Sequence, residues 1–323
     1  MSAPSEFSII QQYFQNLTTS SRDDVLLAIG DDCALLQCPA GQSLAVSIDT
    51  LVEGVHFFAD VDAKSLGHKS LAVGLSDLAA MGARPAWFTL ALSLPEINEP
   101  WLAGFSQGLA ELATEHDIQL VGGDTTRGPL TISIQVHGFV QAENALKRSG
   151  ARAGDKVYVT GTLGDAGAAL QLQLGKLTNN HLTADDCHHF QQRLEQPIPR
   201  VAIGQTLIGL ASSAIDISDG VLADLGHILE QSQVGACLDL ATLPLSPMLE
   251  KMNRIDAEVL ALQSGDDYEL CFTVPAELTA QVEEILGDLC SQIGVITQEQ
   301  GISIINGQAQ LSQITGKGYD HFK

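Results

Sequence analysis

Basic residues are scarce in this chain: 16 lysines and arginines stand against 39 acidic residues among 323, for a formal net charge of -23. Nucleic acids and anionic membrane surfaces bind proteins that carry clustered positive charge. We therefore expect neither a nucleic acid nor a membrane as the main partner. An anionic substrate would need metal ions or a local arginine to offset the negative field of the protein.

Paired cysteines, a basic leader and long apolar runs are also missing. The six cysteines form no C-x-x-C pair and show no zinc-site spacing. No segment reaches 18 consecutive apolar residues, and no basic stretch precedes an apolar one at the N-terminus. We expect a cytoplasmic protein with reduced cysteines, without a signal peptide or a transmembrane span. A Walker sequence G-x4-G-K-[ST] is absent as well.

What remains is the composition of a globular α/β (α+β) protein. Hydrophobic residues make up 45% of the chain and charged residues 17%. A chain of this length forms two domains or one large unit. Alternating strand patterns stop between residues 141 and 155, where glycine, alanine and charge take over. We therefore predict an N-terminal domain over residues 1–148 and a C-terminal domain over residues 149–323.

Residues 44–54 show the pattern of a half-buried strand, because apolar side chains alternate there with small or polar ones. The pattern predicts that the apolar set, Leu44, Val46 and Ile48, faces the core. Ser47 and Asp49 then point together to the opposite face. His56 follows just past the end of this strand.

Acidic residues recur beside glycine or serine at several further places. These are Gly30-Asp31-Asp32, Ser76-Asp77, Gly122-Gly123-Asp124 and Asp216-Ile217-Ser218-Asp219-Gly220. Carboxylate oxygens suit Mg2+, and glycine lets the backbone approach a ligand closely. We interpret the acids as ligands of divalent metal ions that hold nucleotide phosphates. Solvated strand ends and acidic surface turns would give the same residues one at a time.

A helix is predicted over residues 63–81, with Asp62 as its N-cap and Gly82 as its stop. Its expected buried stripe is Leu71, Leu75, Leu78 and Met81. Asp77 falls near the C-terminal end, where the helix macrodipole disfavours a negative charge by about 0.3–1 kcal/mol. That cost suggests a compensating cation.

The segment Gly122–Gly128 combines a glycine pair with an acid, two threonines and an arginine. The exposed N–H groups of such a pair can cradle phosphate, while Asp124 holds a bridging metal ion. A hairpin-like turn would explain the glycines alone. Arg148, inside the charged stretch at 147–150, is either an oxyanion clamp or a solvated linker charge.

Three patterns in the second half predict structure more than chemistry. Residues 161–167 are interpreted as a tight strand-to-helix turn, because their glycine spacing departs from the dinucleotide fingerprint G-x-G-x-x-G. Residues 173–200 predict an exposed helical hairpin or, with His181, His188 and His189, a metal site. Ser218 or Asp219 can cap the helix that follows Gly220.

Taken together, these motifs resemble the thiamine-monophosphate kinases, a family of the PurM-like (aminoimidazole ribonucleotide synthetase-like) superfamily. The resemblance runs from Gly-Asp-Asp-Cys-Ala at 30–34 to Gly-Tyr-Asp-His-Phe at 318–322. It implies a PurM-like two-domain fold, with an N-terminal sheet domain that pairs across a homodimer and an α/β C-terminal domain. It also implies ATP-dependent phosphorylation of thiamine monophosphate to thiamine diphosphate with several Mg2+ ions.

The same resemblance implies roles for individual residues. The magnesium ligands would be Asp32, Ser47, Asp49, Asp77, Asp124, Asp216 and Asp219. Contacts to nucleotide phosphates would come from Gly123, Asp124, Arg148 and Ser218, and contacts to the thiamine side from His56, Asp266 and Tyr319. The catalytic set would be Asp49, Asp77, Asp124 and Arg148. Two positions depart from the family pattern: Ile48 replaces a threonine, and Asp266 replaces a glutamate.

The residue types agree with this chemistry. The acceptor is a phosphate that is already ionised at about pH 7, so catalysis needs charge neutralisation and in-line positioning rather than a general base. Two alternatives are weighed. One is another PurM-like ATP-dependent enzyme, such as aminoimidazole ribonucleotide synthetase or selenophosphate synthetase. The other, a non-catalytic acidic metal-binding protein, does not explain Gly-Gly-Asp-Thr-Thr-Arg.

Overall fold

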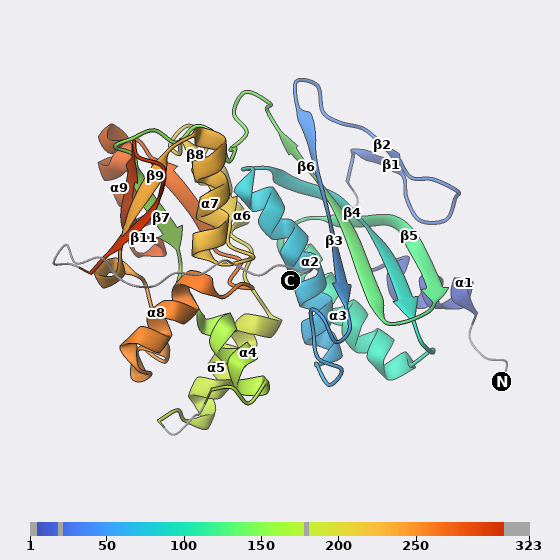
Figure 1. The fold of residues 1–323 in the computed structure, drawn as a ribbon. Helices are drawn as coiled ribbons and strands as arrows, with labels where there is room; N and C mark the ends of the chain where they lie inside the picture. Colours follow the sequence, from blue (N-terminus) through green and yellow to red (C-terminus); the bar gives the residue numbers. More distant parts are fainter. Residues whose placement is uncertain (1–4, 19–21, 178–180, 307–323) are drawn as a thin grey trace. The chain divides into compact units, whose positions relative to one another are not determined.

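The computed structural model describes residues 5–18, 22–177 and 181–306, and the chain divides into two compact units (Figure 1). The N-terminal unit comprises Met1–Leu78 and Ala83–Glu143, and the C-terminal unit comprises Ala79–Gly82 and Asn144–Lys323. Each unit combines a sheet with helices, which confirms the predicted α/β (α+β) class. The domain boundary between residues 148 and 149 stays a prediction.

A four-stranded sheet with the order β3-β6-β4-β5 forms the N-terminal unit. Its strands are β3 (Ser43–Val52), β4 (Arg84–Leu94), β5 (Gln119–Arg127) and β6 (Thr131–Val140). All neighbours are antiparallel except β4 and β5, which are parallel. A hairpin-like turn was the alternative interpretation of the glycine-rich segment that starts at Gly122. It instead continues β5, since residues up to Arg127 pair with β4.

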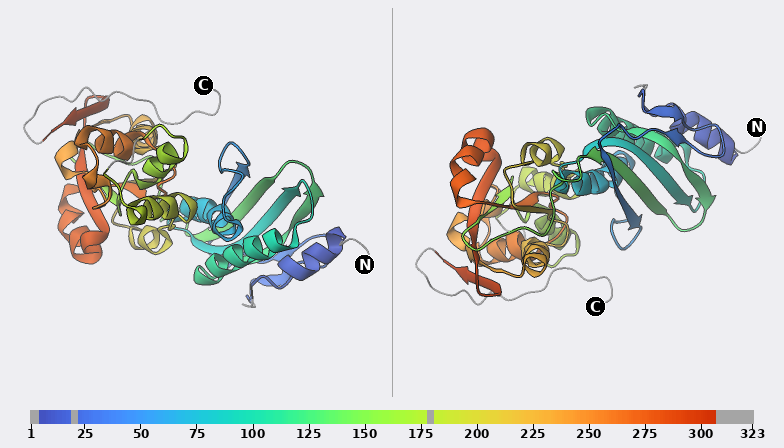
Figure 2. Two further views of the ribbon diagram at one scale, coloured as in Figure 1. Left: turned by 90° about the horizontal axis from the view of Figure 1, so that it is seen from below. Right: turned by 90° about the horizontal axis from the view of Figure 1, so that it is seen from above.

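Two long helices, α2 (Ala63–Ala80) and α3 (Glu99–Glu115), cover one face of this sheet (Figure 2). The Asp62 carboxylate accepts a 2.9 Å hydrogen bond from the backbone N–H of Ser65, which confirms the predicted N-cap. Three members of the predicted stripe on α2 are buried, namely Leu71, Leu75 and Leu78. Met81 lies beyond the end of the helix and is exposed.

A short hairpin covers part of the other face. This hairpin of β1 (Val25–Leu27) and β2 (Leu35–Leu36) packs Val25 and Leu36 against Trp87 and Phe139. At the start of the chain, α1 (Glu6–Ile9) continues as a π-helix over Ile10–Phe14, which packs beside α3, and Ser5 caps α1.

The two faces of β3 are reversed relative to the prediction. Leu44, Val46 and Ile48 were expected in the core, but 43%, 50% and 63% of their surfaces are exposed. The reason is the position of α2. Ser47 pairs with Val136 of β6, and a side chain added at Gly74 of α2 would contact Val136. The helix therefore lies beneath the Ser47 face, and the apolar row of β3 faces away from it.

The C-terminal unit contains a six-stranded sheet with the order β12-β9-β11-β7-β10-β8. Its strands are β7 (Lys156–Thr160), β8 (Ser213–Asp216), β9 (Gly235–Asp239), β10 (Leu270–Val274), β11 (Cys290–Thr297) and β12 (Gly301–Ile305). Its helices are α4 (Asp165–Gln173), α5 (Ala184–Glu195), α6 (Val201–Thr206), α7 (Val221–Ser232), α8 (Arg254–Gln263) and α9 (Thr279–Leu286). Among the described residues, no helix is long and apolar enough to span a bilayer.

The turn from β7 into α4 has the tight geometry that its glycines predicted. Gly164 occupies the N-cap of α4 with a φ of 87°, which lies in the left-handed region. One turn further, a side chain on Gly167 would collide with the side chain of Ser264. In place of the predicted hairpin, the described part of residues 174–200 contains the helix α5, which packs against α4 through Phe190 and Leu194.

Candidate active site

Three predicted ligands meet where β3 crosses α2. Ser47 and Asp49 are two residues apart on β3, so their side chains share the face that α2 covers. The hydroxyl of Ser47 donates a 2.5 Å hydrogen bond to Oδ2 of Asp77 on α2. Asp49 also shares a hydrogen bond with the carboxyl group of Asp77. We call Ser47, Asp49 and Asp77 the β3–α2 acidic cluster.

The electrostatics of this cluster are unfavourable for two free carboxylates. Burial, followed by the negative charge of Asp77 and the hydrogen bond with it, raises the pKa of Asp49 to about 7. The Oδ2 atom of Asp49 is buried, and no group within the described residues donates a hydrogen bond to it. A buried oxygen of this kind is costly, and a cation bound between the two carboxylates would remove the cost.

The residues of the cluster fit a hard divalent cation. Mg2+ takes oxygen ligands and is commonly bound through one or two carboxylates together with water and substrate phosphates. Across residues 5–18, 22–177 and 181–306, no three histidine, cysteine or acidic side chains gather closely enough to hold a metal ion. Asp49, Asp77 and the Ser47 hydroxyl therefore match a magnesium ion that completes its coordination with phosphate and water.

Asp32 and Asp124 lie on other parts of the N-terminal unit. Asp32 is exposed in the loop between β1 and β2, where its N–H donates to the Asp31 carboxylate. Asp124 is exposed on β5, in register with Ala91 and Ser133. That row contains Thr50 rather than Asp49, so Asp124 points to the sheet face opposite Asp49.

Gly123 has a structural role in addition to the predicted contact with phosphate. A side chain at this position would collide with the Leu90 carbonyl of the neighbouring strand. Glycine is therefore required for β4 and β5 to pair at this point. At the end of β3, His56 Nδ1 accepts a 3.0 Å hydrogen bond from the N–H of Val52. Because Nδ1 is the acceptor in that bond, a neutral His56 ring carries its proton on Nε2.

In the C-terminal unit, the segment from Asp216 to Gly220 connects β8 to α7. Asp216 ends β8 and is buried. The predicted cap by Ser218 or Asp219 was wrong: Gly220 holds the N-cap position of α7, and no side chain caps it. The buried carboxylate of Asp224 binds the segment from within the helix instead, accepting a 3.0 Å hydrogen bond from the N–H of Asp219.

Further hydrogen bonds tie Asp224 to this segment. Burial raises the pKa of Asp224 to about 7, against the effect of hydrogen bonds from the N–H groups of Asp219, Gly220 and Ser218. Its carboxylate is thus bound by the backbone of three consecutive residues. We call residues 216–220 the β8–α7 loop.

The segment at Asp266 adjoins the β8–α7 loop, whereas Arg148 contacts the opposite end of α7. The N–H of Asp266 donates to the carbonyl of Ser218 at 2.9 Å, so the predicted nucleotide and thiamine contacts are joined through their backbones. Arg148 is exposed, and its carbonyl accepts a 3.3 Å hydrogen bond from Ser232 at the end of α7. Tyr319, the third predicted thiamine contact, lies outside the described residues.

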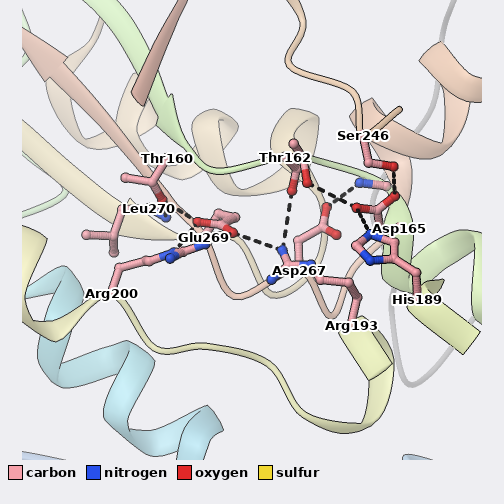
Figure 3. Close-up of polar contacts among 11 residues, drawn as sticks. Thr160, Thr162, Asp165, His189, Arg193, Arg200, Ser246, Asp267, Glu269 and Leu270 are labelled. Atoms are coloured by element: carbon pink, nitrogen blue, oxygen red, sulfur yellow. Dashed lines mark hydrogen bonds and ion pairs between the residues drawn. The ribbon is translucent and has the colours of Figure 1, made fainter. Parts of the chain in front are cut away.

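At the start of β10, close to Asp266 in the sequence, lies a group of buried charges that the sequence did not reveal (Figure 3). Glu269 is fully buried and accepts hydrogen bonds from two arginines and one threonine. Asp165 and Asp267 are also buried. The only sequence signal was the run of acids directly before the apolar strand β10, because acids so close to a buried strand need partners.

Family models and known proteins match nearly the whole of this chain. Residues 30–140 match the N-terminal domain of AIR synthase related proteins, and residues 152–306 match their C-terminal domain. Thiamine-monophosphate kinase from Escherichia coli strain K12 is 49% identical over 322 residues, which cover 98% of each chain. The Haemophilus influenzae kinase is 44% identical and covers 99% of each chain. The chain belongs to the thiamine-monophosphate kinase family.

Solved structures of this family have the same fold. Thiamine-monophosphate kinase from Stenotrophomonas maltophilia K279a has a TM-score of 0.82 at 49% identity, covering 88% of this chain and 92% of that one. AaThiL complexed with AMPPCP and TMP has a TM-score of 0.78 at 29% identity and covers 88% and 89% of the two chains. The PurM-like two-domain fold and the family resemblance read from the motifs are therefore confirmed.

Within the thiamine-monophosphate kinase family fold, the predicted residues fall into three groups. The structure joins Ser47, Asp49 and Asp77 by side-chain hydrogen bonds. It joins Ser218 and Asp266 through a backbone hydrogen bond, and the Asp224 carboxylate holds the backbone of Asp219 beside them. It places Asp32 and Asp124 on exposed surfaces of the N-terminal unit. The roles assigned to all of these residues stay predictions.

Proposed function

We propose that the protein is a thiamine-monophosphate kinase, which transfers the γ-phosphoryl group of ATP to thiamine monophosphate and releases thiamine diphosphate and ADP. The observation that carries the proposal is the β3–α2 acidic cluster, whose buried Asp49 oxygen calls for a cation. It occurs in a chain 49% identical to the Escherichia coli kinase over 98% of both lengths. The AaThiL complex with AMPPCP and TMP supports ATP and thiamine monophosphate as the substrates.

The reaction is an exchange of one P–O bond for another. An oxygen of the thiamine monophosphate phosphate attacks the γ-phosphorus, and the bond from that phosphorus to the β,γ-bridging oxygen breaks. Both substrates are polyanions, so the protein has to neutralise charge and align the reacting oxygens. The acceptor oxygen already carries a lone pair and a negative charge, and no side chain has to remove a proton from it.

In this proposal Ser47, Asp49 and Asp77 hold magnesium. Bound Mg2+ supplies neutralisation of the charge on the transferring phosphoryl group. Asp32, Asp124, Asp216 and Asp219 are proposed as ligands of further ions. Asp49, Asp77 and Asp124, with Arg148, form the proposed catalytic set. The position of Asp77 near the C-terminal end of α2 supports a nearby cation, because the macrodipole there disfavours an uncompensated carboxylate.

The remaining assignments concern direct contacts between the protein and its two substrates. Gly123, Arg148 and Ser218 are proposed to contact nucleotide phosphates; the exposed guanidinium of Arg148 suits an oxyanion. His56, Asp266 and Tyr319 are proposed on the thiamine side. The hydrogen bond from Asp266 to Ser218 supports neighbouring nucleotide and thiamine positions.

We also propose a homodimer that buries the exposed row of β3. Leu44, Val46 and Ile48 form a line of exposed apolar side chains on the edge strand of the sheet. Such a line is typical of an interaction surface, since monomeric proteins seldom expose contiguous apolar rows on a sheet edge. A second copy of the chain would cover it.

A substrate comparison tests the proposed activity. The purified protein, given ATP and Mg2+, is expected to release ADP only when thiamine monophosphate is present, and chromatography should show thiamine diphosphate. Unphosphorylated thiamine is the matched control, because it lacks the acceptor phosphate. Equal turnover of thiamine and thiamine monophosphate would overturn the assignment, and so would ADP release that needs neither.

A further inference from the structure

The loop that carries Asp266 has an unusual backbone. Residues 264–269 connect α8 to β10, and within them Asp266 and Tyr268 have φ values of 67° and 51°. The left-handed region is unfavourable for side chains with a Cβ, and a tyrosine seldom occupies it. Such a conformation persists only where the surrounding structure enforces it. We call residues 264–269 the Asp266 loop.

Glu269, at the end of this loop, is the centre of a buried ion cluster (Figure 3). Arg200 donates to both of its carboxylate oxygens, through Nε at 2.6 Å and through a terminal nitrogen at 2.6 Å. Arg193 donates to Oε1 at 2.9 Å, and the Thr160 hydroxyl donates to Oε2 at 2.6 Å. A single carboxylate thus binds α5, the start of α6 and β7 to the end of the loop.

Asp267, which lies between the two residues of positive φ, fixes the middle of the loop. Its side chain is fully buried and accepts a 2.8 Å hydrogen bond from the N–H of Gly164, at the start of α4. Asp267 and Glu269 therefore flank Tyr268 and point inward, whereas Asp266 remains partly exposed. The Tyr268 N–H is fixed as well, since it donates to the Ile217 carbonyl at 2.9 Å.

The chain also makes room for the cluster. A side chain on Gly161, which has a φ of 56°, would collide with Oε1 of Glu269 and approach Arg200. The carboxylate of Glu269, far along the sequence, thus explains why residue 161, the first of the β7–α4 turn, is a glycine. Leu270, the next residue, donates its N–H to Thr160 Oγ1 at 2.8 Å, so the start of β10 is held by the same threonine.

We propose that Glu269 is a positioning residue for the thiamine side of the active site: its ion cluster holds the Asp266 loop in the left-handed conformation that presents Asp266. This inference rests on the proposed function. Glu269 itself, being fully buried, does not touch the substrate. Its replacement should therefore weaken binding of thiamine monophosphate and leave the proposed magnesium ligands of the β3–α2 acidic cluster unchanged.

The test compares Glu269→Gln with Asp155→Asn. Asp155 is another buried carboxylate of the C-terminal unit, which binds Ser212 and the N–H of Arg152 and makes no contact with the Asp266 loop. In Glu269→Gln the KM for thiamine monophosphate should rise by about tenfold or more, because a small displacement of a group that contacts the substrate weakens substrate binding considerably. The KM for ATP should rise by a clearly smaller factor, because the proposed nucleotide contact Ser218, although hydrogen-bonded to the loop, is also held by Asp224. Asp155→Asn should change neither constant.

A milder variant covers the case in which Glu269→Gln does not fold. Thr160→Val removes one of the four hydrogen bonds to Glu269 and should raise the same KM by a smaller factor. Amide hydrogen exchange of residues 264–270 provides a readout without catalysis, and exchange there should be faster in both variants than in Asp155→Asn. Equal changes in both KM values, or an unchanged KM for thiamine monophosphate in Thr160→Val, would overturn the proposal.

The two proposals fail in different ways. If the parent protein does not phosphorylate thiamine monophosphate, the proposed function fails whatever the variants do. If the parent protein is active and the variants lose kcat without a selective change in KM, only the positioning role of Glu269 fails.

Discussion

At the scale of single residues, Asp77 is where stability and activity make opposite demands. Its carboxylate lies near the C-terminal end of α2, beside the buried Asp49. Asp77→Asn keeps the shape and removes one charge, so the metal-free variant should unfold at the same or a higher temperature than the parent protein. Turnover should fall about 100- to 1000-fold, as for the loss of one preorganised electrostatic contact.

The measurements for Asp77 are thermal melts and initial rates at saturating Mg2+. Mg2+ with an ATP analogue should raise the melting temperature of the parent protein more than that of the variant. A variant that unfolds without metal would make Asp77 a structural residue. A variant with turnover near that of the parent would remove it from the catalytic set.

The same pair of carboxyl groups predicts how stability depends on pH. The pKa of Asp49 rises from 3.8 to about 7 on folding. Between these values the folded protein retains a proton that the unfolded chain has released, so the free energy of unfolding decreases as the pH rises. Metal-free parent protein should therefore lose melting temperature from about pH 4 to about pH 7 more steeply than Asp77→Asn. Parallel pH profiles for the two proteins would contradict this.

At the scale of elements, the start of α7 is organised by a side chain inside the helix. Asp224 accepts hydrogen bonds from the backbone of the β8–α7 loop, in which Ser218 is a proposed nucleotide contact. Asp224→Asn places an amide donor against backbone N–H groups, and the loss of a charged hydrogen bond of this kind should raise the KM for ATP roughly tenfold.

Another aspartate that accepts a hydrogen bond from a backbone N–H provides the control for this prediction. Asp239 accepts from the N–H of Ala241 in the same unit, on an exposed turn. Asp239→Asn makes the same chemical change and should leave the KM for ATP unchanged. Steady-state kinetics of both variants measure the KM for ATP. An unaltered KM for ATP in Asp224→Asn would show that the β8–α7 loop holds its shape without this carboxylate.

How far the sequence predicts an element depends on whether its signal is local. The N-cap at Asp62 and the stripe of α2 follow from residues a few positions apart; the N-cap was predicted correctly, and so was the stripe except for Met81. Which face of β3 is buried depends on where α2 packs, and alternation alone assigned it wrongly. Glu269 was missed for the same reason, because its partners lie on β7, α5 and the start of α6.

At the scale of the whole molecule, the exposed row of β3 predicts the state of assembly. Ile48 is 63% exposed, and Ile48→Glu would place a charge in the proposed dimer interface. A charge buried there costs about 3 kcal/mol or more, which weakens dimerisation about 100-fold or more. Light scattering should find the parent protein as a dimer and the variant as a monomer at micromolar concentration.

Ile255 on α8 offers a matched control, since it is 65% exposed in the C-terminal unit. Ile255→Glu adds the same charge and should leave the dimer intact. A monomeric parent protein with full activity would contradict the proposed assembly, as would an Ile48→Glu variant that dimerises like the parent.

The close fit of Gly167 against Ser264 has a consequence for the evolution and engineering of this chain. Gly167 lies inside α4, where alanine would be preferred by about 1 kcal/mol if there were room for its methyl group. Gly167→Ala alone should lower the melting temperature, because the methyl group meets the side chain of Ser264. Combined with Ser264→Gly, it should be neutral or stabilising, and melts of the two single variants and the double variant would measure the coupling. The two positions are therefore epistatic, and a substitution that is harmful in this background becomes acceptable in a lineage that first lost the serine.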